Sequence, residues 1–156
     1  MGQGGGRALP TREQLRVWRG YIETAEILRT RLAGRLQGES SLSSGDYQVL
    51  LALSEAEQRT LRSSALAVQI GWERSRLSHH LGRMEKRELI RRVSCPDDIH
   101  GVDVIMTDSG AEAFRASTVP HLRAIREVFV DALTAEQLAH VEELTVALRR
   151  HLDLPD

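Results

Sequence analysis

Apolar residues recur at steps of three and four between residues 15 and 36, which is the period of one face of a helix. Thr11 and Gln14 form a capping-box pattern just before this stripe, so a helix is predicted from residue 11 to about residue 37. Such a helix is roughly 40 Å long. The apolar stripe packs either in the core of its own chain or in an interface with another subunit, and the sequence leaves both possibilities open. The stripe consists of Leu15, Trp18, Ile22, Ala25, Leu32 and Leu36.

Shorter elements follow a Ser/Gly-rich linker at residues 38–45. A short apolar helix over residues 47–53, a polar turn and a minimal strand at 60–62 are predicted first. Ser63 or Ser64 is expected to cap the next short helix, and Gly71 to end it, because glycine adopts the left-handed C-terminal conformation at least cost. A third helix is predicted at residues 73–87, with a narrow apolar stripe of Leu77, Leu81 and Met84.

The pattern then changes to a β-hairpin. Residues 89–93 and 102–106 have strand-like patterns, and residues 94–101 are rich in turn formers. Helix, glycine turn, polar helix and hairpin in this order predict a winged helix-turn-helix. A further helix is predicted from residue 111 to about 131, which Pro120 should bend or split. Thr134 and Gln137 form a second capping box, which opens a last helix.

Composition supports a mainly α fold. The 156 residues fit one domain, and only 4% are aromatic, so the core must be built from Leu, Ala, Val and Ile. No apolar run approaches the roughly 18–20 residues of a membrane helix, and residues 1–7 lack the apolar region of a signal peptide. One cysteine excludes an internal disulfide framework. We therefore expect a cytoplasmic protein without a cofactor or a membrane partner.

Charge is distributed unevenly along the chain. Its formal net charge is only −1, but residues 59–96 carry nine basic and three acidic side chains. Residues 97–156 are acidic, with a net charge of −7. A compact basic block of this kind is either a solvated helix face or a footprint for a phosphate backbone. It coincides with the polar helix at 73–87, which favours nucleic acid.

Several stretches, in this order and spacing, resemble the MarR-type winged-helix transcriptional regulators, and the run from Trp72 is similar to a subgroup common in actinobacteria. The resemblance covers about residues 42–151. The stretches are Tyr47-Gln-Val-Leu50, Trp72-Glu-Arg-Ser-Arg-Leu-Ser-His-His-Leu81, Arg83-Met-Glu85, Leu89-Ile-Arg91, Cys95-Pro-Asp-Asp98 and Met106-Thr-Asp-Ser-Gly110.

The resemblance implies a homodimer that binds double-stranded DNA, and it divides one continuous domain, 11–151, into parts. These are a flexible arm at 1–10, a dimerisation helix at 11–37, a winged helix-turn-helix at 42–107 and C-terminal dimerisation helices at 108–151. The fold class is mainly α with a small β-hairpin wing. The family is typically a repressor at palindromic operators. It often binds a small phenolic or lipophilic effector, for which Trp18, Tyr47 and His121 could line a pocket.

Carried over to this sequence, the resemblance places Arg74, Ser75, Ser78 and His79 toward bases, and Arg83 and Lys86 toward phosphates. Arginine can bind guanine with two hydrogen bonds, and lysine neutralises phosphate, so these residue types suit the roles. The alternative for each is a solvated surface side chain.

The wing departs from the family pattern. Its tip usually reads Asp-Arg-Arg-Ala/Gly, but here it reads Asp98-Ile99-His100-Gly101. A histidine is cationic only near or below about pH 6.5. We therefore predict that the contact of Asp98 and His100 with DNA is weak or pH-sensitive.

The sequence supports three other functions to different degrees. An enzyme is disfavoured because the six histidines do not cluster with carboxylates and no catalytic motif is present. A winged helix that contacts only proteins remains open, since fold does not prove function. A redox switch at Cys95 also remains open, because Arg91 and Arg92 are near in sequence and could lower the pKa of the thiol.

Overall fold

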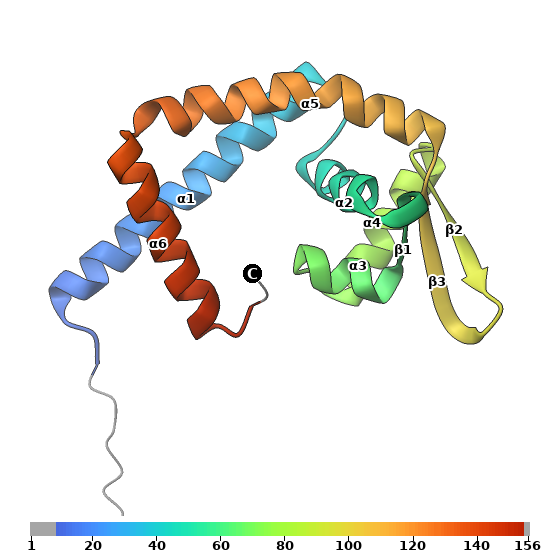
Figure 1. Ribbon diagram of the computed structural model, residues 1–156, viewed down its shortest axis with the longest axis horizontal. Coiled ribbons are helices and arrows are strands. Elements are labelled where there is room, and N and C mark those ends of the chain that lie inside the picture. The colour runs from blue at the N-terminus through green and yellow to red at the C-terminus, as the bar shows by residue number, and fades with distance from the viewer. Residues whose placement is uncertain (1–8, 155–156) are drawn as a thin grey trace, which may run out of the picture.

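The computed structural model describes residues 9–154, which form two lobes connected by one long helix (Figure 1). Most of the predicted arm at 1–10 lies outside the described residues. The helix α1 (Arg12–Glu39) begins after Thr11, whose hydroxyl accepts a hydrogen bond from the Gln14 backbone. The Gln14 side chain accepts one from the Thr11 backbone in return, so the first capping box is confirmed.

The first lobe is a winged helix-turn-helix, as predicted. It contains α2 (Ser44–Glu55), η1 (Glu57–Arg59), β1 (Thr60–Arg62), α3 (Ser63–Ile70), α4 (Arg74–Lys86), β2 (Ile90–Cys95) and β3 (Asp98–Met106). Gly71 ends α3 in the left-handed region at φ 69°, which confirms the expected stop. The predicted serine cap of α3 is wrong. Arg62 ends β1 and occupies the cap position, so Ser63 is already helical and no side chain caps this helix.

The sheet has the order β1-β3-β2 and is antiparallel throughout. The wing is longer than predicted, because only Pro96 and Asp97 form its turn. Backbone pairing continues into residues that carry turn-forming side chains, with Cys95 opposite Asp98. The register shifts between Ser94 and Cys95, so Ile99, His100 and Gly101 form an irregular stretch of β3 next to the tip.

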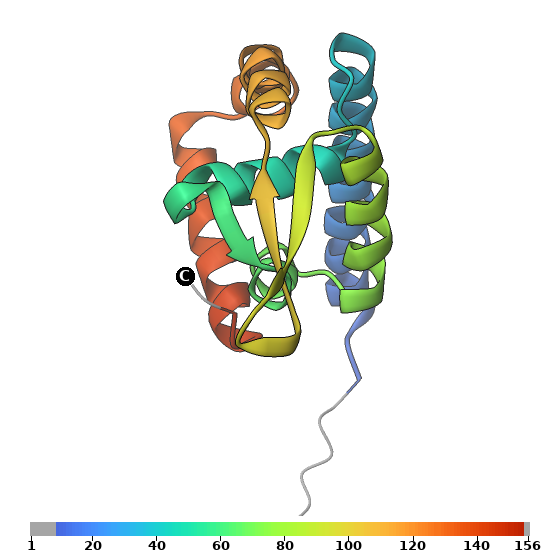
Figure 2. The same ribbon diagram turned by 90° about the vertical axis from the view of Figure 1, so that its right-hand side faces the viewer.

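The hydrophobic core lies inside the winged lobe. It combines α2, α3, α4 and the sheet, and the predicted stripe of Leu77, Leu81 and Met84 is fully buried in it. The α1–α2 linker contributes Leu42, and α5 contributes Ala111. Figure 2 shows the wing and α4 side by side on one face of this lobe.

The second lobe consists of α1, the distal half of α5 (Asp108–Val128), η2 (Val130–Ala132) and α6 (Ala135–His151). Pro120 lies inside α5 and does not split it, since a proline removes one backbone hydrogen bond and the helix has at least two turns on either side. Arg35 of α1 forms an ion pair with Glu127 of α5 at 2.5 Å. The second capping box, of Thr134 and Gln137, opens α6 as predicted.

No helix in the described part of the chain is long and apolar enough to cross a membrane.

Candidate nucleic-acid interface

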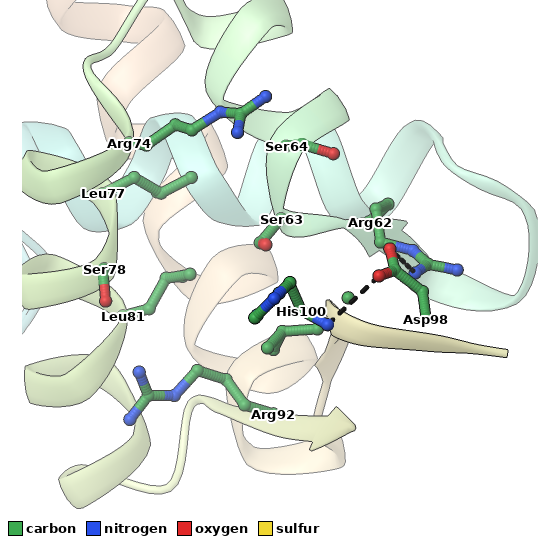
Figure 3. A pocket seen from close by; sticks show the side chains of 12 residues that line it. Arg62, Ser63, Ser64, Arg74, Leu77, Ser78, Leu81, Arg92, Asp98 and His100 are labelled. Atoms are coloured by element: carbon green, nitrogen blue, oxygen red, sulfur yellow. Dashed lines mark hydrogen bonds and ion pairs between the residues drawn. The ribbon is translucent and has the colours of Figure 1, made fainter. Parts of the chain in front are cut away.

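The helix α4 presents a polar and cationic surface opposite its buried stripe. All six side chains that the sequence singled out on this helix are exposed. They are Arg74, Ser75, Ser78, His79, Arg83 and Lys86. Arg74 lies in the first turn of α4 and faces the same groove as the wing residues Asp98 and His100 (Figure 3).

A groove of about 420 Å³ separates α4 from the wing. It brings together four of the predicted site residues, Arg74 and Ser78 from α4 and Asp98 and His100 from the wing (Figure 3). Ser75, His79, Arg83 and Lys86 lie on the same helix but do not line this groove. The lining also includes two arginines that the sequence did not assign to this surface, Arg62 and Arg92.

Arg62, the last residue of β1, contacts two carboxylates of the wing strand β3. Its Nη1 lies 3.4 Å from Asp98 Oδ2, and its Nε lies 3.1 Å from Asp103 Oδ1. The other oxygen of Asp98 accepts a hydrogen bond from the His100 backbone at 3.1 Å. A side chain at Gly101 would collide with the Arg62 guanidinium and crowd Asp98, so it would displace this contact. Asp98 therefore orders the wing tip through its contacts with Arg62 and His100.

Arg92 joins the wing to the end of α4. Its guanidinium donates to Glu85 Oε2 at 2.9 and 3.1 Å, and its backbone N–H donates to Oε1 at 2.9 Å. These bonds from Arg92, first from its backbone and then from its side chain, lower the pKa of Glu85. The hairpin is thus held to α4 by an ion pair at the edge of the groove.

A buried carboxylate fixes α4 on its opposite flank. Asp46 is 1% exposed and caps α2 through Ser43. Its Oδ2 accepts a hydrogen bond from Arg87 at 2.7 Å, and its Oδ1 lies 3.0 Å from His80 Nε2. Burial alone would raise the pKa of Asp46, but the contacts with His80, Arg87 and the Ser43 backbone outweigh it and hold that pKa well below its usual range.

The wing tip offers little positive charge. Ile99 is 96% exposed, and its neighbour His100 is exposed as well. The nearest guanidinium, that of Arg62, is already paired with two carboxylates. This arrangement is consistent with the weak wing contact that the sequence predicts.

A second cavity of about 590 Å³ lies where α1, α2 and α5 meet the α3–α4 turn. It brings Tyr47 and His121 together, with ring centroids 4.4 Å apart, but Trp18 lies elsewhere on α1 and is exposed. Trp72 lines the cavity instead, with the Arg76 guanidinium 4.1 Å above its ring. His121 Nδ1 is buried without a hydrogen-bond partner among the described residues, and burial lowers the pKa of this side chain.

Cys95 does not have the environment of a reactive thiol. It is buried beside the turn of the wing, and burial, followed by a hydrogen bond with Asp103, raises the pKa of the thiol. The expected lowering by Arg91 and Arg92 is therefore wrong, because the charges that act on the thiol are those of Asp103, Arg62 and Asp98, and Arg92 is paired with Glu85. Within residues 9–154, no group of three or more His, Cys, Asp or Glu side chains could hold a metal ion.

Comparisons with known proteins agree with this geometry. A scan against protein-family models finds no match, and neither does a search of curated proteins. Solved structures do match. AbsC, a MarR family transcriptional regulator from Streptomyces coelicolor, is 32% identical with a TM-score of 0.85, over 94% of this chain and 98% of that one.

A second protein from Streptomyces coelicolor, the MarR family regulator Sco3205 in complex with DNA, is 36% identical with a TM-score of 0.88. The match covers 96% of this chain and 93% of Sco3205. A mutant MarR from E. coli complexed with operator DNA shares the fold at 19% identity and a TM-score of 0.76, over 90% of this chain and 99% of that one. Fold, motif order and these relatives agree, and this chain belongs to the MarR family of transcriptional regulators.

Proposed function

We propose that this protein regulates transcription by binding palindromic operator DNA as a homodimer, and that it represses the promoter it covers. The observation that carries the proposal is the exposed cationic face of α4 beside a wing, joined to it by the Arg92–Glu85 ion pair. The relative Sco3205, whose structure contains DNA, supports it. In this proposal Arg74, Ser75, Ser78 and His79 read bases.

The first test is selection of binding sites from a random duplex DNA library. We expect an enriched inverted repeat with half-sites about one helical turn apart, because a two-fold dimer places its two recognition helices in successive major grooves. Failure to enrich any sequence at low salt would contradict the proposal. Transcription from a promoter carrying the selected site, measured with and without the protein, then tests repression, and activation would overturn that part.

Salt dependence separates DNA recognition from the alternative of a protein-binding winged helix. Phosphate contacts release counterions, so affinity for the selected DNA should fall steeply with salt. The logarithm of the binding constant should fall with the logarithm of the salt concentration, with a slope of about −0.9 per phosphate contact. Replacing Lys86 with Ala should weaken binding to all sequences and reduce the slope by about one. A selected complex that is insensitive to salt would favour the alternative.

Arg74 provides the residue-level test of base recognition. Its replacement by Ala should cost about 1–3 kcal/mol of binding free energy and relax the preference at one base position. Arg115→Ala is the matched control, because Arg115 is an exposed arginine on α5, outside the groove. Equal effects of the two substitutions would remove Arg74 from the set of base-reading residues.

The homodimer is proposed from apolar side chains that the second lobe leaves exposed. The described part of α6 has no buried residue, and α1 buries only Leu36. Large exposed apolar patches mark interaction sites. A second copy is the occupant we propose, because both helices carry exposed apolar side chains at helical spacing and so offer the same surfaces on each protomer. The exposed side chains are Leu15, Val17, Trp18, Tyr21 and Ile22 on α1, and Leu144, Val146 and Leu148 on α6.

We further propose that the 590 Å³ cavity takes a small phenolic or lipophilic effector that releases the DNA. Aromatic rings line it, and the free His121 Nδ1 offers a hydrogen-bond acceptor or donor to a hydroxyl group. Trp72 gives a direct readout. In a Trp18→Phe variant it is the only tryptophan, so its fluorescence should change when a phenol binds. A panel of phenols that changes neither fluorescence nor DNA affinity would contradict an effector of this class.

A further inference from the structure

His80 lies on the flank of α4 and is not among the exposed residues of the recognition surface. Its side chain is 12% exposed and packs edge-on against Trp72, with ring centroids 5.1 Å apart. A Cβ atom at Gly45 would lie only 2.8 Å from the His80 ring, so the ring can pack against α2 only because residue 45 is glycine. The imidazole is thus held in one orientation between α2 and the α3–α4 turn.

The contacts of the ring define which nitrogen carries the proton. Arg83 Nη2 lies 3.0 Å from His80 Nδ1. A guanidinium only donates hydrogen bonds, so Nδ1 must accept and carries no proton. The single proton of the neutral ring is therefore on Nε2, which lies 3.0 Å from Asp46 Oδ1. In this state His80 holds the guanidinium of Arg83, a candidate phosphate ligand, against the flank of the helix.

A second proton on His80 is incompatible with this arrangement. Nδ1–H and the Arg83 guanidinium would then be two donors, both positively charged, at hydrogen-bond distance. Arg83 is exposed and can swing away, whereas the ring is enclosed. The protonated ring would keep one favourable partner, because Asp46 of α2 is ionised and is itself shared with Arg87. Trp72 and Gly45, the other groups against the ring, carry no charge.

We propose that His80 is a positioning residue for Arg83. When Arg83 moves to a DNA phosphate, His80 takes up a proton, so that DNA affinity rises as pH falls. This inference rests on the proposed DNA binding. Departure of the guanidinium removes a positive charge from Nδ1, and the arriving phosphate adds a negative one nearby. Both changes favour the protonated ring. By linkage, protonation must favour DNA binding to the same extent.

Calorimetry of operator binding at pH 7, in buffers of different ionisation enthalpy, counts the protons taken up. The operator is the site recovered by selection. We expect His80→Gln to bind DNA but to take up fewer protons than the natural chain, by up to about one per protomer, because an amide does not titrate. His140→Gln is the matched control, an exposed histidine on α6, and should behave as the natural chain does. Equal proton uptake in the His80 and His140 variants overturns the proposal.

Two measurements keep the result independent of whether His80→Gln folds well. NMR of the natural chain should show His80 becoming protonated at higher pH in the DNA complex than in the free protein, with affinity changing about tenfold per pH unit of this displacement. In the free protein, Arg83→Met should likewise raise the pH at which His80 becomes protonated, without any DNA. No displacement with Arg83→Met overturns the positioning role alone, whereas no DNA binding at any pH overturns the proposed function itself.

Discussion

The two lobes use apolar residues in opposite ways. The winged lobe encloses its own, and Leu50, Leu81 and Met84 have at most 1% of their surface exposed. In the second lobe Trp18 is 59% exposed and Leu148 is 39% exposed, although both lie on regular helices with apolar stripes. The first lobe has a complete core within one chain. Among the described residues, the second has well-capped helices but no comparable cluster of buried side chains, so their apolar stripes need another surface.

The contrast explains why periodicity alone left the role of the first helix open. A stripe at steps of three and four shows that one helix face prefers burial, but it does not identify the surface that covers it. Leu77 and Leu81 face their own lobe because α2 and the sheet surround α4. Leu15, Trp18 and Ile22 also follow steps of three and four, but the described part of the chain places no comparable layer over them.

The sharpest test of this difference is truncation of one leucine in each lobe. Leu50→Ala should lower the free energy of unfolding by about 3–5 kcal/mol at every protein concentration, because it leaves a cavity in a closed core. Leu148→Ala, the counterpart on α6, should cost less, and its cost should depend on concentration if the residue is buried only in the proposed dimer. Urea denaturation at two protein concentrations measures both. Two equal, concentration-independent losses would show that the lobes do not differ in this way.

A charge on α6 should act on assembly more than on folding. Leu148→Glu places a carboxylate in the proposed dimer interface, where burial without a partner should cost about 2–4 kcal/mol of association free energy. Sedimentation velocity should show monomers at concentrations at which the natural chain is dimeric, while helical content by circular dichroism stays the same. Glu143→Gln is the control at an exposed acidic position of the same helix. A Leu148→Glu protein that remains dimeric would contradict this interface.

The winged lobe also contains a buried charged side chain, that of Asp46. Among the described residues, the second lobe contains no buried charged side chain. Asp46→Asn should lower the free energy of unfolding by about 2 kcal/mol at pH 7, since Arg87 loses its ionised partner but is half-exposed and regains water. The pKa of Asp46 is lower in the folded than in the unfolded state. Its contribution is therefore present above the unfolded value of about pH 4 and is lost as pH falls below it.

Unfolding measured at pH 7 and pH 3 checks this sign. The stability difference between the natural chain and Asp46→Asn should shrink at pH 3, where the unfolded carboxyl group is protonated. A difference that stays constant between the two pH values would show that the ionised state of Asp46 does not stabilise the lobe.

Local patterns predicted most elements of both lobes because their causes are local. The two threonine capping boxes and Gly71 place helix ends with contacts that span three or four residues. The wrong cap of α3 has a different origin. Ser63 would be a good N-cap in isolation, but pairing of β1 with β3 extends the strand to Arg62, and the helix starts one residue earlier than the serine pattern requires.

The site was only partly predictable for the same reason. The exposed residues of α4 follow from the position of its buried stripe, since the opposite face of a helix is known once one face is assigned. Arg62, Asp46 and His80 carry no such signal. Arg62 meets Asp98 across 36 positions, and Asp46 meets Arg87 across 41, so their roles arise only when the strands and helices pack.

The smallest expected effect concerns the wing tip, which resembles the second lobe in exposing a large apolar side chain, that of Ile99. His100→Arg should raise operator affinity at pH 8 by about 1 kcal/mol or less, because an arginine is cationic throughout this range and adds one phosphate or minor-groove contact. The pH-sensitive wing contact that the sequence predicts would make this gain smaller at pH 6 than at pH 8. Ile99→Ala, at the exposed neighbouring position, controls for a general change of the tip. If His100→Arg leaves affinity unchanged from pH 6 to pH 8, the wing of this protein does not contact DNA through residue 100, and recognition depends on α4 alone.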